Sequence, residues 1–338
     1  MPSNVVPLKK LETSNPYEEL RSTYQSEIEK VDDFIKDKLS SYVELIGEMA
    51  SYLFKSGGKR LRPLLTIASS SLFGYQGDRH INLAACVELI HNATLLHDDV
   101  IDKSDFRRGN KTNNNIWGNK NSILTGDYLL SRCFEIMVED GSLEVLKLLS
   151  SVSSEIAQGE ILQLQHEKEI ETLEKTYLEI IGAKTSSLFA AAMRVGGCIN
   201  DRSKNEKEAL TSFGANFGIS FQITDDILDY YSNSTSFGKS IGNDFHEGKI
   251  TLPMIMLYQK SNDGERLILK NMFIEKERTI EQLNYTLNLM SKYKVIAACK
   301  KRAEHFSSVS SDSLGIFPET KEKKRLQDLA FYIVNRIN

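Results

Sequence analysis

The distribution of proline is the sequence feature that most constrains what this chain can fold into. Six prolines stand at positions 2, 7, 16, 63, 253 and 318, so the stretch from Leu64 to Leu252 contains none. Because proline breaks a helix interior, this stretch permits long helices. Within the segment 82–100, residues suited to a core recur at steps of three and four, which indicates a helix with one buried face. These residues are Leu83, Val87, Ile90, Thr94 and Leu95.

Similar periodicity predicts helices over most of the chain. The predicted ranges are 18–38, 41–55, 62–72, 121–138, 143–165, 171–195, 204–230, 250–260, 278–298 and 322–336. Strand signals are weak, and we therefore predict an all-α protein. Glycine and small polar residues mark the breaks between helices, but no break is long enough to be a linker between domains. We predict a flexible lead-in over residues 1–16 and one helical domain over residues 17–338.

Composition and charge limit the classes of function that the chain can have. The chain is 41% hydrophobic and 26% charged, which is typical of a globular protein with a sizeable core. It shows no long apolar segment and no signal-peptide pattern. A net charge of −4 argues against broad nucleic-acid binding, which normally requires a basic excess. The four cysteines, Cys86, Cys133, Cys198 and Cys299, form no Cys-x-x-Cys pair, and we expect reduced core thiols in a cytoplasmic protein.

Two aspartate motifs carry the main chemical signal. They are Asp98-Asp99-Val100-Ile101-Asp102 and Asp225-Asp226-Ile227-Leu228-Asp229. On a helix, the first and last aspartates of each motif lie one turn apart on one face, where like charges are destabilising. Both motifs follow apolar sequence, which is a poor place for unpaired charge. The arrangement indicates a bound cation, and carboxylate oxygens favour Mg²⁺ shared with substrate phosphates.

Basic residues near glycines supply the opposite charge. Lys59, Arg60 and Arg62 follow Gly57-Gly58, whereas Arg107 and Arg108 follow the first aspartate motif, and Lys239 and Lys249 follow the second. Such groups are suited to a bound diphosphate. His91 lies two helical turns before Asp98, where it is either a phosphate donor or a satisfied core histidine.

Other phosphate chemistries fit less well. The chain has no Gly-x-x-x-x-Gly-Lys-Ser/Thr loop, so it is not a P-loop nucleotide enzyme. The pair His97-Asp98 occurs in metal phosphohydrolases, but the remaining histidines, at positions 80, 91, 166, 246 and 305, form no evident ligand set.

Over roughly residues 17–338 the chain resembles the trans-isoprenyl diphosphate synthases. The shared motifs, in order, are residues 57–63 (GGKRLRP), His91, the first aspartate motif with Arg107-Arg108-Gly109, Gly126-Asp127, Gly159-Glu160, Lys184-Thr185, Phe221-Gln222 with the second aspartate motif, Gly238-Lys239 and Glu247-Gly248-Lys249. The resemblance implies a helical bundle around a deep central cavity, usually as a homodimer. It also implies the reaction: Mg²⁺-assisted loss of diphosphate from an allylic substrate, attack by isopentenyl diphosphate, and proton loss.

The resemblance also implies roles for individual residues. Asp98, Asp102 and Asp225 would hold Mg²⁺, about three ions per site, with Asp99, Asp226 and Asp229 as supporting carboxylates. The allylic diphosphate would be bound by Arg107, Lys184, Thr185, Gln222 and Lys239. Isopentenyl diphosphate would be bound by Lys59, Arg62, His91 and Arg108. For Thr185 and Gln222, helix packing or local hydrogen bonding is the open alternative. Asn243 and the asparagines at 113–115 depart from the family pattern.

Small residues before the first aspartate motif bear on the length of the product. Ala93 and Thr94 would face the growing chain, where short-chain members carry a bulky aromatic residue. We therefore expect a product of about eight to ten isoprene units, of the kind used as a quinone side chain, as in ubiquinone. Leu149 is a candidate for the cavity floor. The expected primer is farnesyl or geranyl diphosphate, and release of the product is expected to involve at most transient membrane contact.

Three alternatives remain open on the sequence. The first is a short-chain synthase, which would differ only at the cavity floor. The second is a non-catalytic partner subunit, although such chains typically lose an aspartate motif. The third is a terpene cyclase, which would be expected to lack the Lys59, Arg62 and His91 set for a second diphosphate.

Overall fold

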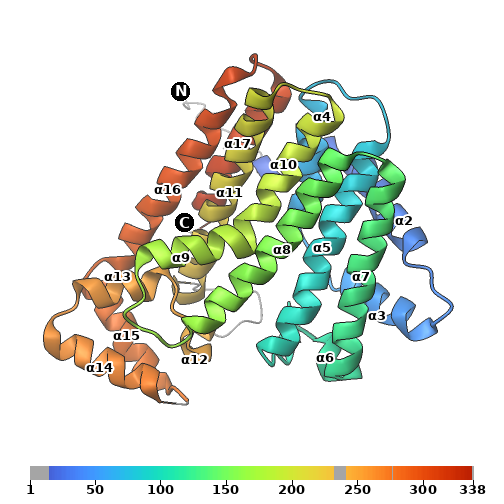
Figure 1. Cartoon of the computed structure of the whole chain (residues 1–338). Helices are drawn as coiled ribbons and strands as arrows, with labels where there is room; N and C mark the ends of the chain where they lie inside the picture. The colour runs from blue at the N-terminus through green and yellow to red at the C-terminus, as the bar shows by residue number, and fades with distance from the viewer. Residues whose placement is uncertain (1–14, 232–240, 276, 337–338) are drawn as a thin grey trace, which may run out of the picture.

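A computed structural model describes residues 15–231, 241–275 and 277–336. They form a bundle of α-helices (Figure 1), and the predicted all-α fold is confirmed. The helices of the N-terminal half are α1 (Pro16–Thr23), α2 (Gln25–Lys38), α3 (Glu44–Lys55), α4 (Leu61–Ser71), α5 (Arg79–Ile101), α6 (Asn113–Trp117), α7 (Asn119–Asp140) and α8 (Leu143–Gln165). Those of the C-terminal half are α9 (Glu174–Ile181), the π-helix η1 (Gly182–Ser186), α10 (Ser187–Ile199), α11 (Lys204–Tyr231), α12 (Asn243–Glu247), α13 (Leu252–Lys260), α14 (Asp263–Ile274), α15 (Ile280–Lys292), α16 (Val295–Ser313), the 3₁₀ turn η3 (Leu314–Ile316) and α17 (Lys321–Asn335).

Three predicted helices prove to be interrupted. The range 18–38 is broken at Tyr24, and the range 171–195 contains the π-helix η1 between α9 and α10. The range 278–298 is broken at Lys294, whose φ of 51° is left-handed and ends a helix. The short helices α6 and α12, and all of α14, were not predicted. Most of the predicted lead-in lies outside the described residues, and α1 begins at Pro16, with Asn15 as its N-cap.

The apolar interior consists of two clusters, and helix α11 contributes to both. The larger cluster lies among α1 to α5, α7, α8, α10 and α17, and the smaller lies among α9 and α12 to α16. The N-terminal half of α11 packs into the larger cluster through Phe213 and Phe217, and its C-terminal half packs into the smaller through Ile223 and Ile227. Helix α11 therefore fixes the two parts of the bundle against each other.

Helix α5 lies at the centre of the bundle. The prediction of one buried face is wrong, because every residue from Leu83 to Ile90 is buried, including Glu88. A helix that neighbours surround on all sides buries its whole circumference. Thr94 and Leu95, which were assigned to the buried face, are only half-buried. Thr94 and Leu95 lie in the C-terminal third of α5, where most side chains are only half-buried.

A small hairpin follows α5. Strand β1 (Phe106–Arg107) pairs antiparallel with β2 (Asn110–Lys111), which the weak strand signal did not predict. The two turn residues, Arg108 and Gly109, both have positive φ, of 53° and 79°. A two-residue hairpin turn favours such angles, and glycine adopts them without strain. The hairpin therefore fixes the backbone from which Arg107 and Arg108 project.

Two further predictions were tested by the described residues. All four cysteines are buried free thiols, as expected. Within the described ranges, no helix combines the length and the apolar character that crossing a membrane requires.

Candidate functional site

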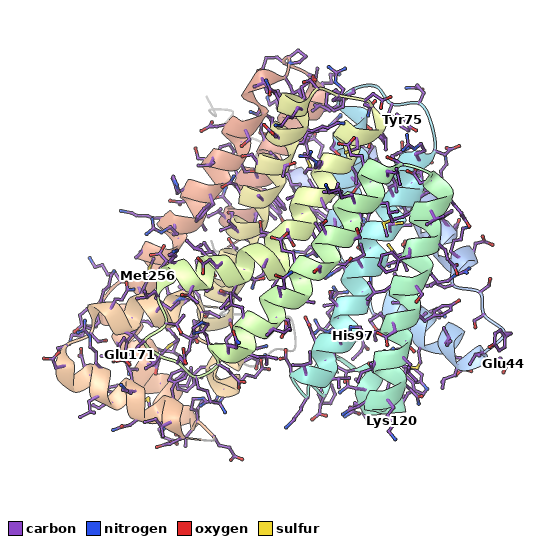
Figure 2. The ribbon with its side chains drawn as sticks, in the orientation of Figure 1. Glu44, Tyr75, His97, Lys120, Glu171 and Met256 are labelled. Carbon is purple, nitrogen blue, oxygen red and sulfur yellow. The ribbon has the colours of Figure 1, made fainter. Side chains whose placement is uncertain are left out.

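The two aspartate motifs lie in the last turns of α5 and α11. Both helices end near α6 and α12, at the lower end of the bundle in Figure 1. Figure 2 labels His97, the neighbour of Asp98, towards this end, and Tyr75 at the opposite end. Lys249, from the loop after α12, donates from Nζ to Asp102 Oδ2 at 2.9 Å. The segment after the second motif therefore contacts the first motif directly.

Within each motif the second aspartate turns toward the protein. Asp99 is 2% exposed and accepts from Arg107 Nη2 at 2.7 Å and from Nε at 2.9 Å. Asp226 is 4% exposed and accepts from the Tyr177 hydroxyl at 2.6 Å and from Gln222 Nε2 at 2.7 Å. Asp98, Asp102 and Asp225 are more open. Asp229, the third predicted supporting carboxylate, is also half-buried and accepts from the backbone N–H of Asp244 at 3.0 Å. Burial therefore separates the second aspartate of each motif from the other two, and the predicted metal roles stay predictions.

Two carboxyl groups of the site have raised pKa values. Burial raises the pKa of Asp98 to about 6, and nearby Glu160 and Asp102 contribute while Lys184 opposes. Burial also raises the pKa of Asp226 to about 7, although its hydrogen bonds from Tyr177 and Gln222 oppose the shift. A bound cation would relieve this burial of carboxylates.

The residues fit Mg²⁺ as a cofactor shared with the substrate. Among the described residues, no three carboxylate, histidine or cysteine side chains form a ready-made metal cage. Mg²⁺ does not need one, because it is usually held by one or two carboxylates together with substrate phosphates. Asp98 and Asp102, one turn apart at the end of α5, supply such a pair, and Asp225 lies on α11.

The predicted ligands of the allylic diphosphate come from η1, α11 and the hairpin. Lys184 forms an ion pair with Glu160, and its Nζ lies 3.7 Å from Asp98 Oδ2. Thr185 donates to Gln222 Oε1 at 3.0 Å, so the local hydrogen bonding kept as an alternative for both residues is present. This bond orients the Gln222 amide toward Asp226. A π-helix often marks a functional site, and η1 holds Lys184 and Thr185 together. Lys239 lies outside the described residues.

The predicted isopentenyl diphosphate ligands converge around α4 and the hairpin. The side chain of Arg108 lies against Gly58, since a Cβ there would be 2.9 Å from Arg108 Nη1. Lys59 interacts electrostatically with Asp225. Burial lowers the pKa of Arg62 to about 10, although Glu88 and Asp225 oppose the shift. Burial, together with the charges of Arg62 and Arg108, holds the pKa of His91 well below its usual range, so its imidazole is neutral.

The surroundings of the Arg62 guanidinium are suited to a bound anion. Its guanidinium stacks on the Phe189 ring, 4.2 Å from the centroid. Its Nε is buried and has no hydrogen-bond partner among the described residues. An unpaired buried donor is costly, and a phosphate oxygen would satisfy it.

Arg60, which the sequence groups with these cations, has a different environment. It donates to Glu88 at 2.8 Å and to Asp32 at 3.2 Å. These bonds pin the start of α4 to α5 and α2. Arg60 therefore supports the Gly57-Gly58 loop through bonds to protein carboxylates.

Several residues near the site were not assigned roles from the sequence. Tyr177 holds Asp226, and Asn114 donates to the backbone carbonyls of Asp99 and Ser104, which ties α6 to the end of α5. The asparagine-rich segment that departs from the family pattern is thus a support for the first motif. Arg336, near the C-terminus, lies 3.2 Å from Asp225 and stacks over Phe221. A lone arginine at the end of a chain has no sequence signal that would identify it.

The residues assigned to product length lie on α5 and α8. Ala93 is 0% exposed and belongs to the larger core cluster together with Leu149. Thr94 is half-buried and donates to the His91 carbonyl at 2.7 Å. The predicted central cavity and its floor stay predictions.

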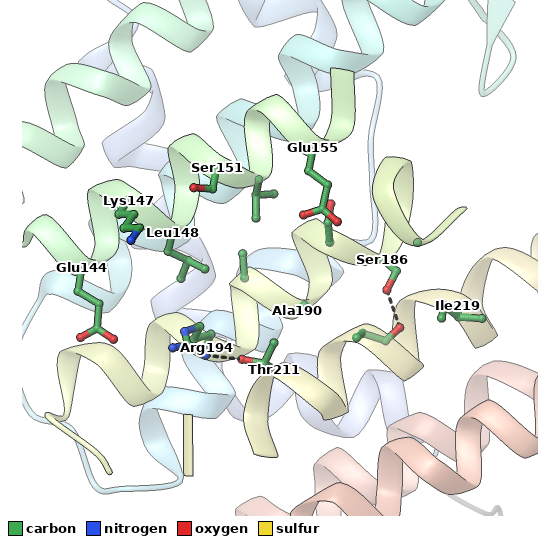
Figure 3. A pocket seen from close by; sticks show the side chains of 15 residues that line it. Glu144, Lys147, Leu148, Ser151, Glu155, Ser186, Ala190, Arg194, Thr211 and Ile219 are labelled. Atoms are coloured by element: carbon green, nitrogen blue, oxygen red, sulfur yellow. Dashed lines mark hydrogen bonds between the residues drawn. The ribbon is translucent and has the colours of Figure 1, made fainter. Parts of the chain in front are cut away.

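A separate pocket of about 750 Å³ lies between α8, α10 and α11 (Figure 3). Its lining includes the small side chains of Ser187, Ala190 and Ala215. Figure 3 shows Glu144 and Arg194 at one end. It contains none of the predicted site residues.

Comparison with known proteins identifies the family. Residues 43–290 match the family model described as polyprenyl synthetase. The octaprenyl diphosphate synthase of Haemophilus influenzae is 34% identical over 319 residues, which cover 94% of this chain and 97% of that protein.

Two crystal structures share the whole architecture. A decaprenyl diphosphate synthase from Rhodobacter capsulatus is 39% identical, covers 96% of this chain and 100% of its own, and superposes with a TM-score of 0.91. A polyprenyl synthase from Caulobacter crescentus, complexed with calcium and isoprenyl diphosphate, is 37% identical. The match covers 95% of this chain and 98% of that protein, and its TM-score is also 0.91. With both aspartate motifs and the converging cations in place, the chain belongs to the polyprenyl synthetase family and is a prenyltransferase that makes prenyl diphosphates.

Proposed function

We propose that this chain is a long-chain trans-polyprenyl diphosphate synthase that adds isopentenyl diphosphate repeatedly to an allylic diphosphate. The observation that carries the proposal is the meeting of two aspartate motifs with two groups of cations at one end of the bundle. The product is about eight to ten isoprene units long. Ala93 and Thr94 support this length, and the similar octaprenyl and decaprenyl synthases agree with it.

The site residues fall into two groups, one for each diphosphate substrate. Asp98, Asp102 and Asp225 hold Mg²⁺, which supplies positive charge to the departing diphosphate when bound. Arg107, Lys184 and Lys239 stabilise the same negative charge as it develops in the transition state. Thr185 and Gln222 orient the allylic group. Lys59, Arg62, His91 and Arg108 hold isopentenyl diphosphate so that its double bond attacks the allylic cation. The similar Caulobacter structure holds calcium and isoprenyl diphosphate, which supports a divalent cation and a prenyl diphosphate as the ligands of this site.

Oligomeric state and location complete the proposal. The outward side of α7 exposes Leu124 (64%) and Val138 (66%), and α8 exposes Ile161 (58%). Exposed apolar residues of this kind favour a protein interface, and we assign α7 and α8 to a homodimer. A cytoplasmic location agrees with four free thiols.

One experiment tests the activity and the product length together. The purified chain is incubated with Mg²⁺, labelled isopentenyl diphosphate and farnesyl diphosphate, and the products are measured by mass. Products of about eight to ten units are expected. Products of three or four units would instead identify a short-chain synthase.

Absence of incorporation would point to a partner subunit or to a terpene cyclase. The partner-subunit role would then be tested by adding an active synthase. Both aspartate motifs are present, which argues against this role. A terpene cyclase would release a hydrocarbon or alcohol from the allylic substrate alone. The buried Arg62 Nε, which has no hydrogen-bond partner among the described residues, lies in the electrostatic environment of His91 with Arg108. This arrangement argues against a cyclase, because an unpaired donor there fits a second diphosphate.

A further inference from the structure

One buried carboxylate at this end of the bundle has no role in the assignments above. Glu160 lies on α8 and is 8% exposed. Its neighbour Gly159 lets α8 approach η1 closely, since a Cβ on Gly159 would lie 2.7 Å from the backbone nitrogen of Lys184. This approach brings the Glu160 carboxylate into an ion pair with the Lys184 ammonium.

The two side chains hold each other. Apart from this ion pair, neither carboxylate oxygen of Glu160 has a hydrogen-bond partner within the described part of the chain. A carboxylate buried without a cation is strongly destabilising, and the half-buried Lys184 supplies the cation for Glu160. Glu160 therefore restricts where the flexible Lys184 side chain places its charge.

The position of that charge matters for the substrate. Lys184 Nζ also lies 3.7 Å from Asp98 Oδ2. An ammonium group has three N–H donors. With one directed at Glu160 and one toward Asp98, the third remains for an acceptor beside the first aspartate motif.

We propose that Glu160 is a positioning residue for the allylic diphosphate. It acts through Lys184, whose ammonium it anchors beside Asp98 so that the remaining N–H meets a diphosphate oxygen next to the metal ligands. The inference rests on the proposed function, because it assumes an allylic diphosphate at Lys184. A different role for Glu160, as a negative charge that merely repels the diphosphate, predicts the opposite effect when the charge is removed.

The test is the substitution Glu160→Gln, which keeps the shape and removes the charge. Binding of geranyl S-thiolodiphosphate, an unreactive allylic analogue, is measured by calorimetry in the presence of Mg²⁺. We expect its dissociation constant to rise about tenfold or more. In turnover, the KM for the allylic substrate rises and the KM for isopentenyl diphosphate stays unchanged. Unchanged or tighter analogue binding overturns the inference.

Matched variants separate positioning from general effects. Glu155→Gln removes an exposed carboxylate from the same helix and leaves binding unchanged. In a Lys184→Gln background, Glu160→Gln causes no further loss, because the residue it positions is gone. An equal further loss in that background contradicts the inference.

A third variant covers the case in which Glu160→Gln fails to fold. Glu160→Asp keeps the charge but shortens the side chain by one methylene, so it weakens binding if Glu160 must reach Lys184. Unchanged binding in this variant overturns the inference. A wild-type chain that does not bind the analogue overturns the proposed function as well, whereas a binding wild type with unaffected variants overturns this inference alone.

Discussion

At the residue scale, Asp98 and Asp226 show what it costs to enclose carboxylates near other carboxylates. Asp98 is half-buried and Asp226 is buried, and the loss of water around each carboxylate is the main cause of its raised pKa. Hydrogen bonds to Asp226 and the charge of Lys184 near Asp98 oppose these shifts without cancelling them. The two carboxylates differ in accessibility. Asp98 is open to a metal, whereas Asp226 is enclosed by Tyr177 and Gln222.

These raised pKa values predict the pH dependence of stability in the metal-free chain. The folded-state pKa of Asp98, about 6, lies above its usual value of 3.8, so the folded chain binds this proton more tightly than the unfolded chain. The stabilisation by the proton is complete below about pH 4 and is lost as the pH rises through about 6. For Asp226 the loss extends to about pH 7.

We therefore expect the melting temperature in EDTA to rise by about 2 °C or more between pH 8 and pH 6, measured by scanning calorimetry. The variant Asp98→Asn lacks one of the two groups and should show a weaker dependence. A melting temperature that falls over this range would contradict the assignment.

The metal role of Asp98 has a separate consequence for turnover. Asp98→Ala removes one of the open carboxylates and should lower isopentenyl incorporation by several orders of magnitude. Asp105→Ala, which removes an exposed carboxylate outside the motif, is the control and should keep its activity. Full activity of Asp98→Ala would refute the metal role.

At the element scale, the site depends on helices that approach one another closely. Gly214 on α11 faces α10, and a Cβ there would lie 2.7 Å from Ala190 Cα. Gly159 does the same for α8 and η1. These contacts fix the spacing of the helices that carry Lys184 and the second aspartate motif, because backbone atoms cannot move aside as a flexible side chain can.

Gly214→Ala should therefore be destabilising by about 1–3 kcal/mol. The matched control is Gly47→Ala on α3, where the new Cβ meets nothing within 4 Å. It should be neutral or stabilising by up to about 1 kcal/mol, since alanine favours a helix. Denaturant unfolding measures both, and equal effects would contradict this account of the packing.

Helix α5 carries the prediction on product length. Ala93→Phe should shorten the product to about three isoprene units if Ala93 borders the growing chain. Because Ala93 is fully buried, the melting temperature distinguishes two outcomes. A ring that enters an open cavity leaves stability nearly unchanged, whereas a ring forced into a packed core costs about 1–3 kcal/mol. An unchanged product distribution by mass would contradict the placement.

At the scale of the whole molecule, the bundle brings distant segments to one end. Lys249 reaches Asp102, and Arg336 reaches Asp225, across separations that no local pattern encodes. The exposed apolar residues of α7 take no part in these ion pairs, which leaves that face available for a second copy.

The assignment of the dimer face predicts a change of oligomeric state. The double variant Leu124→Glu and Val138→Glu should convert a dimer to a monomer, because it buries two charges in the interface. Sedimentation measures the mass, and the control is Leu267→Glu, which alters an exposed apolar residue on α14. A variant that remains dimeric would contradict the proposed face.

Much of the fold follows from local patterns in the chain. Helical periodicity over a proline-free stretch predicted most of the helices, because hydrophobic spacing and backbone sterics act over a few residues. Periodicity failed where tertiary contacts decide the structure. It could not show that α5 is buried all round over residues 83–90, nor that η1 is a π-helix, since both depend on what surrounds the helix. It also missed the hairpin, which is too short for a strand pattern.

By itself, the sequence determined the all-α fold, the two aspartate motifs and the cations that point to diphosphate. The tertiary structure alone decided which aspartates are buried against partners and that Arg60 supports a loop. It also decided that Tyr177 and Asn114 support the two aspartate motifs and that Glu160 pairs with Lys184. The physical reason is the distance along the sequence over which the interactions act. A motif specifies which groups are present, but burial, charge balance and the direction of a hydrogen bond arise between helices that are far apart in the chain.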